Sequence, residues 1–196
     1  TLKNILSKMP YNKYLILLFT AIILTAACDD DNGNDNNPDI PPAEFDSVTF
    51  SFKSQNLELS GEEVEAGALV DVNNNIKRMV ISAQNETSGQ TAELCIEINS
   101  NSSVESTSYP ITTTAGDGNA RIVYASLQGD NIVVYSSQNT GTLSIESLDM
   151  QEETLSGNFS TEMEASADNA TDAAEGAFNL PFISSTAEED VSDCSI

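Results

Sequence analysis

The sequence predicts an all-β protein, a single antiparallel β-sandwich or small barrel of about eight or nine strands that follows a disordered tether. Apolar and polar residues alternate with a period of two in several short segments, which is the pattern of half-buried strands. Turn-forming Asn, Ser and Gly residues separate these segments. No stretch of the body shows a convincing helical stripe, so we expect one β-rich domain of about 140 residues.

The first expected strand follows Asp46, where Val48, Phe50 and Phe52 alternate with polar residues. Further strands are expected at Ile76–Ala83, Ala92–Ile98, Ala120–Leu127, Ile132–Ser136, Gly141–Leu148, Leu155–Met163 and Glu175–Pro181, with a weaker candidate at Val64–Val72. Between Ala120–Leu127 and Ile132–Ser136, Gln128–Asn131 has the composition of a short hairpin connection.

Two later segments have the composition of connections. Asp149–Glu153 is polar and is expected to be a turn. Ala165–Glu175 could form a helical turn, but its composition is more typical of a loop.

Large apolar side chains share the predicted inner face and are bulky enough to fill a small core. They are Phe50, Phe52, Leu143, Ile145, Phe159 and Phe178. Tyr109, Tyr124 and Tyr135 could line a binding face, but tyrosines on strands more often pack against cross-strand neighbours. We therefore expect a filled interior.

The N-terminal residues 1–27 have the organisation of a secretory signal peptide. Three lysines precede the apolar run Leu15–Leu24, and small residues close it. The run is too short for a transmembrane anchor, which needs about 20 residues. Met9 is an alternative start that would give a signal peptide of ordinary length.

The segment Thr25–Cys28 resembles the bacterial lipobox, in which small residues precede a cysteine that receives a diacylglycerol. We therefore expect Cys28 to be the lipidated N-terminus of the mature chain, because acyl chains anchor a protein strongly to a membrane. The alternative is an ordinary cleaved signal peptide followed by a free cysteine.

Asp29, Asp30 and Asp31 follow directly and resemble the acidic export signal of surface lipoproteins of Bacteroidota. A competing rule, known from enteric bacteria, interprets Asp after the cysteine as retention in the inner membrane. The Asp- and Asn-rich residues 28–43 cannot bury enough apolar surface to fold, so they are expected to form the tether.

The charge of the chain argues against nucleic acid as a partner. Its 31 acidic and seven basic residues give a formal net charge of −24. Three of the basic residues lie in the predicted signal peptide, so the mature chain has four basic against 31 acidic residues, a net charge of −27. Nucleic acid is therefore not an expected partner, because its binding requires Lys and Arg to neutralise phosphates.

The residue types also argue against ordinary catalysis. The chain has no histidine, the commonest general base, and two of its three cysteines, Cys95 and Cys194, cannot complete a four-ligand zinc site. The carboxylates Glu58, Glu62, Glu63 and Glu65 are expected to lie in a solvated loop. The sequence therefore predicts no enzyme, no cofactor and no metal site.

Cys95 and Cys194 are expected to form a disulfide, because exported proteins meet oxidising conditions. In the strand Ala92–Ile98, Leu94 and Ile96 alternate with Cys95, so Cys95 should point away from the core and face solvent. The bridge would fix the polar tail, residues 185–196, across the outer face of the sheet. The alternative is two free thiols.

A resemblance to a known family rests on the C-terminal half. The segments Gly141–Ile145, Leu155–Phe159 and Glu175–Phe178, with Asp149 between the first two, resemble a pattern in a family of uncharacterised lipoproteins of Bacteroidota. The family has no assigned activity, so the resemblance implies no functional residues. In addition, Asp46–Val48 resembles the O-glycosylation motif of these bacteria, with Ser47 as the acceptor, although a simple strand start explains these three residues better.

The predicted organisation is a signal peptide at 1–27, a lipidated tether at 28–43, a β-sandwich domain at 44–184 and a C-terminal tail at 185–196. We expect a non-catalytic lipoprotein of the outer membrane that faces the cell exterior and has a binding or structural β-domain. Its expected partners are the lipid membrane, through the acyl anchor, and an extracellular protein or glycan. The alternative is a small barrel-like lipoprotein that binds an apolar ligand in its interior.

Overall fold

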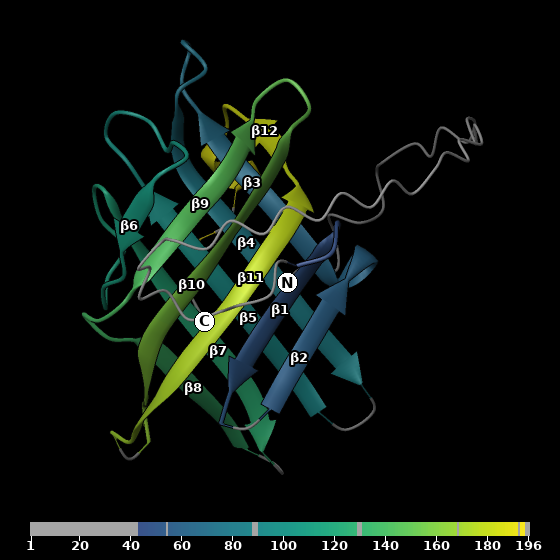
Figure 1. Ribbon diagram of the computed structural model, residues 1–196, viewed down its shortest axis with the longest axis vertical. Helices are drawn as coiled ribbons and strands as arrows, with labels where there is room; N and C mark the ends of the chain where they lie inside the picture. Colours follow the sequence, from purple (N-terminus) through teal and green to yellow (C-terminus); the bar gives the residue numbers. More distant parts are fainter. Residues whose placement is uncertain are drawn as a thin grey trace, which may run out of the picture. The chain divides into compact units, whose positions relative to one another are not determined.

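The computed structural model describes residues 43–53, 55–87, 90–128, 131–167, 169–191 and 193–194, which form one curled, mixed β-sheet of twelve strands (Figure 1). In these ranges the chain forms no α-helix, and its two short 3₁₀ helices are η2 (Gly61–Glu63) and η3 (Glu188–Asp190). The predicted all-β class is therefore confirmed, and the sheet takes the form of a half-barrel.

The curled sheet has two halves, which we call layer A and layer B. Layer A contains, in spatial order, β6 (Ser108–Pro110), β9 (Thr142–Asp149), β10 (Thr154–Ala165), β11 (Thr171–Pro181), β1 (Ser47–Phe52) and β2 (Gln55–Ser60). Layer B contains β12 (Ile183–Ser185), β3 (Val64–Val70), β4 (Ile76–Thr87), β5 (Gln90–Asn99), β7 (Asn119–Gln128) and β8 (Asn131–Ser137). Figure 1 shows the strands of the two layers crossing each other.

Strand β10 joins the two layers because it changes partner along its length. Its residues Thr154–Ser160 pair with β9 of layer A, whereas Met163–Ala165 pair with β8 of layer B. Between these two stretches, isolated hydrogen bonds connect β10 to the segment that follows β8. The Gln138 N–H donates to the Glu162 carbonyl at 2.9 Å.

The chain turns from β8 into β9 at residues 138–141, against the edge of β10. Gly141 has φ +84°, a conformation that favours glycine. A Cβ at this position would lie 1.9 Å from the carbonyl oxygen of Ser160, so the close approach also requires glycine. We call residues 138–141 the corner, because they allow one continuous sheet to form both layers.

Two Gly-x-Phe segments fix the register of β10 and β11. In this antiparallel pair Gly157 lies opposite Phe178, and Phe159 lies opposite Gly176. A Cβ at Gly157 or at Gly176 would lie 2.6 Å from the ring of the opposing phenylalanine. Each glycine therefore leaves the space that the partner's ring occupies, which explains why the Gly-x-Phe pattern occurs in both strands.

Aromatic side chains of the two layers meet in the interior. The ring centroids of Phe50 and Tyr124 are 4.9 Å apart, as are those of Phe52 and Tyr135. One hydrophobic cluster extends through both layers, and it includes every residue predicted for the inner face and all three predicted core tyrosines. The prediction of a filled interior is confirmed at these positions.

The structure corrects several sequence-based expectations. It adds three strands, β2, β6 and β12, and β12 pairs with β3 in parallel, so the sheet is mixed and has twelve strands. Strands β6 and β12 have only three residues each, too few to show a period of two. β2 (Gln55–Ser60), which pairs with β1, and η2 occupy much of the segment where the carboxylate loop was expected.

The expected loop at Ala165–Glu175 is also shorter than predicted. Strand β11 already begins at Thr171, which pairs with Glu164 of β10. Its first three residues are exposed, so they carry no apolar alternation, and the pairing with β10 rather than burial makes them a strand.

Gly176→Ala should lower the free energy of unfolding by about 1–3 kcal/mol, because an added Cβ would lie 2.4 Å from the Thr49 carbonyl oxygen and force the backbone or the Phe159 ring to shift. Denaturant titration of the purified protein measures the change. Gly67→Ala in β3 is the control, because the nearest atom to its Cβ, in Val191, lies at an ordinary 3.5 Å. Equal effects of the two variants would contradict the explanation.

Candidate functional site

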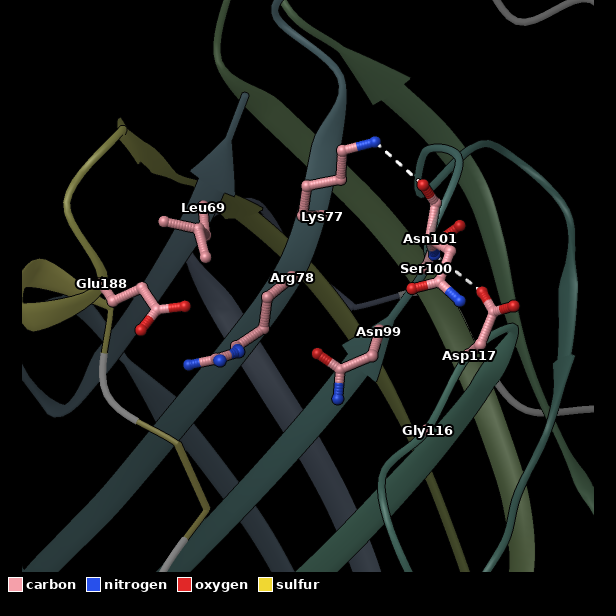
Figure 2. Close-up of a pocket in the computed structure, with 9 residues that line it drawn as sticks. All are labelled: Leu69, Lys77, Arg78, Asn99, Ser100, Asn101, Gly116, Asp117 and Glu188. Carbon is pink, nitrogen blue, oxygen red and sulfur yellow. Dashed lines mark hydrogen bonds between the residues drawn. The ribbon is translucent and has the colours of Figure 1, made fainter. Parts of the chain in front are cut away.

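A polar groove lies on layer B, where β4 begins and β5 ends (Figure 2). Its volume is about 520 Å³. The lining residues come from β3, β4, β5, the loops that follow β5 and precede β7, and η3. They are Leu69, Lys77, Arg78, Asn99, Ser100, Asn101, Gly116, Asp117 and Glu188.

Strand pairing and short loop bonds place these residues together. Arg78 of β4 lies opposite Asn99 of β5 in the antiparallel register. The Gly118 N–H donates to the Asn99 carbonyl at 2.9 Å, and the Asn101 N–H donates to Oδ1 of Asp117 at 2.7 Å. The loop before β7 is thereby attached to the end of β5 and forms one wall of the groove.

The ammonium group of Lys77 has three polar partners within the described part of the protein. It donates to the carbonyl oxygens of Asn101 and Ser102 and forms an ion pair with Asp71 at 3.3 Å. Hydrogen bonds from the side chain and the backbone of Asn75, with smaller contributions from Asn73 and Lys77, hold the pKa of Asp71 well below its usual range. Lys77 therefore acts as a connector between two loops.

Arg78 makes fewer and longer polar contacts than Lys77. In the part of the chain that the structure describes, its Nη1 donates to the Val191 carbonyl at 3.5 Å and its Nε lies 3.9 Å from Oε1 of Glu97. The Nε atom is buried and makes no hydrogen bond there. The side chain is 25% exposed and lines the groove.

Glu97 forms an ion pair with Arg78. Its carboxylate is buried and accepts a 2.9 Å hydrogen bond from Nδ2 of Asn99. A buried charge is stable only when it is paired and hydrogen-bonded. Glu97 thus pairs with Arg78 and bonds to Asn99, two residues that line the groove.

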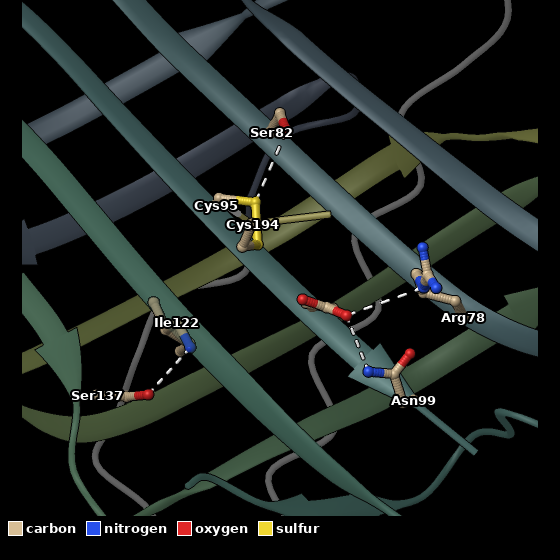
Figure 3. The surroundings of a disulfide bond; sticks show 8 residues. Arg78, Ser82, Cys95, Asn99, Ile122, Ser137 and Cys194 are labelled. Atoms are coloured by element: carbon tan, nitrogen blue, oxygen red, sulfur yellow. Dashed lines mark hydrogen bonds and ion pairs between the residues drawn. A yellow bond between two sulfur atoms is a disulfide. The ribbon is translucent and has the colours of Figure 1, made fainter. Parts of the chain in front are cut away.

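The predicted disulfide between Cys95 and Cys194 is present beside this site (Figure 3). Cys95 points away from the main core, as its strand register predicted, but it does not face solvent. It is only 3% exposed, because Val191 and Cys194 of the C-terminal tail pack over it together with Val80 and Val123. The expectation of an exposed Cys95 was wrong because strand period alone does not show what covers the outer face.

The remaining predicted site residues lie elsewhere. Cys28, Asp29, Asp30 and Asp31 fall outside the described residues. Ser47 begins β1, is 2% exposed, and donates its hydroxyl to the Glu44 carbonyl at 2.6 Å. Glycosylation of Ser47 would therefore have to precede folding.

The described ranges contain neither a cluster of metal ligands nor a membrane-spanning helix. There, no group of three or more His, Cys, Asp or Glu side chains could hold a metal ion. In the same ranges, no helix has both the length and the apolar composition to cross a bilayer.

Comparison of the chain with protein-family models, with curated proteins and with solved structures found no match. The resemblance to a lipoprotein family therefore stays a prediction.

Sequence reasoning did not identify the groove. One signal was present, because Lys77 and Arg78 are two of only four basic residues in the predicted mature chain and are adjacent. The other lining residues are ordinary turn and loop residues, and only the tertiary contacts bring Glu188 to the ends of β4 and β5.

Cys194→Ser should lower the free energy of unfolding by about 2–4 kcal/mol, because the disulfide closes a long loop and holds the tail over Val80 and Val123. Both proteins should carry Cys28→Ser, so that only this cysteine pair responds to reductant. Thermal unfolding with and without reductant makes the measurement. Reduction should bring the unsubstituted pair to the melting temperature of the variant, and a variant as stable as the oxidised protein would contradict the role of the bridge.

Proposed function

We propose that this chain is an exported lipoprotein, held in the outer membrane by acyl groups on Cys28, whose β-domain faces the cell exterior and binds a partner without catalysing a reaction. The observation that carries the proposal is the Cys95–Cys194 disulfide. Structural disulfides persist in oxidising compartments and are rare in the cytosol, so the bridge supports export.

The sequence before the domain supports anchoring. A basic and apolar run ends at small residues directly before Cys28, and an acidic triplet follows. The strongly negative charge disfavours adsorption to anionic lipid through surface charge, which makes a covalent anchor the consistent mode of membrane attachment.

The filled interior and the groove on the outside of the domain support binding at its surface. Rings such as those of Phe50, Phe52, Tyr124 and Tyr135 pack against one another in the interior, which argues against an apolar ligand there. The polar groove on layer B, with a volume of about 520 Å³, is large enough to hold a small molecule. The absence of histidine from the sequence favours recognition over acid–base chemistry at this groove.

Lipidation can be measured by growth of a Bacteroidota host with radiolabelled palmitate. The full chain should incorporate the label and Cys28→Ser should not, because the thiol is the acylated atom. Ala26→Ser, which keeps a small residue before the cysteine, is the matched control and should still be labelled. Label in the Cys28→Ser variant would refute the anchor.

Surface exposure can be measured by protease treatment of whole cells. The unsubstituted protein should be degraded, whereas a variant with Asp29, Asp30 and Asp31 all changed to Ala should be protected, because the acidic signal is lost. Replacement of the three acids by Glu keeps the charge and should leave the protein accessible. If all three proteins behave alike, the acidic residues act only as a spacer.

A further inference from the structure

We infer that the groove on layer B binds a small zwitterion of the α-amino acid type, with the carboxylate of the ligand on Arg78 and its ammonium group on Glu188. This inference rests on the proposed binding function and names the chemistry of its ligand. It follows from two opposite charges that face the same groove without meeting.

Arg78 supplies the positive end. Its two contacts within the described ranges, at 3.5 Å to Val191 and 3.9 Å to Glu97, are long for a guanidinium group that carries five donors. The side chain is 25% exposed at the groove. A carboxylate can accept two parallel hydrogen bonds from such a guanidinium, which is the strongest common pairing for this side chain.

Glu188 supplies the negative end. It is exposed, it lines the same groove, and Figure 2 shows its carboxylate and the guanidinium of Arg78 turned toward each other. Among the described residues the two groups form no ion pair with each other. A ligand that carries both charges could occupy the space between them and complete both interactions.

Three other ligand classes fit less well. An anion would be repelled by a chain of net charge −24 and by Asp117 and Glu188 in the lining, whereas a zwitterion has no net charge. An apolar ligand would meet Leu69 as the one large apolar lining residue. A sugar would lack a stacking surface, because none of the nine lining residues is aromatic.

The remaining lining residues suit a polar side chain on the ligand. The volume of about 520 Å³ exceeds what an amino acid backbone needs. Asn99, Ser100 and Asn101 bring amide and hydroxyl groups to the lining, and Asn99 keeps its amide oxygen and a second amide N–H beyond its bond to Glu97. The ligand class is therefore an α-amino acid with an amide or hydroxyl side chain.

Isothermal titration calorimetry on the full chain, purified in detergent, tests the inference with L-glutamine, L-asparagine and L-serine added singly. At least one should bind. The amide of that amino acid, which lacks the carboxylate, and its N-acetyl derivative, which lacks the ammonium group, should each bind about tenfold more weakly or worse, because each loses one charged pairing.

Two variants test which residue binds each charged group of the ligand. Arg78→Gln should weaken the amino acid about tenfold and remove the distinction between the amino acid and its amide. Glu188→Gln should instead remove the distinction between the amino acid and its N-acetyl derivative. Lys53→Gln is the control, because it also removes one positive charge, but from an ion pair with Asp172 that does not line the groove.

Each outcome of these experiments either supports or overturns the inference. No binding of any of the three amino acids, equal binding of the derivatives, or an equal loss with Lys53→Gln would overturn the inference. The comparison of derivatives uses the unsubstituted protein, so it stands even if Arg78→Gln fails to fold. Palmitate labelling and surface exposure do not depend on the groove, so a failure here leaves the proposed anchoring and location to be judged separately.

Discussion

The fold depends on the corner at residues 138–141, where the chain moves from β8 to β9 while both strands follow the same edge of β10. The corner is possible because Gly141 adopts a positive φ and lies against the Ser160 backbone, where a side chain would not fit. The two layers are therefore parts of one sheet rather than separate sheets. Sheets commonly bend at glycines and bulges, and β10 also has a register shift against β9 between Ser156 and Gly157.

This curl determines where the molecule can interact. The inner faces of both layers meet, and aromatic residues of β1, β7, β8, β10 and β11 fill the space between them. The reciprocal Gly–Phe pairs of β10 and β11 leave space for the rings of Phe159 and Phe178 beside the opposing strand. Because the interior is occupied by side chains, the polar groove lies outside it, on layer B.

The outer face of layer B is in turn built by the C-terminal tail. The disulfide holds Val191 and Cys194 over Val80 and Val123, which gives this face a small apolar cluster of its own. Val191 also accepts the hydrogen bond from Arg78, and Glu188 lies three residues before it. The bridge therefore orders the segment that contributes one wall of the groove, so stability and the geometry of the groove are linked through the same residues.

The sequence by itself determined the all-β class, most strands, the inner-face residues and the disulfide partners, because alternation and turn residues are local signals that burial of one face imposes on each strand. The corner, the parallel pairing of β12 and the cover over Cys95 were decided only by the tertiary structure. These features depend on contacts between segments far apart in the chain, such as Ile183 beside Gly67 and Cys194 beside Cys95. The groove belongs to the same class, because Arg78 and Glu188 carry no shared local pattern and acquire a joint role only when the tail is fixed across β4 and β5.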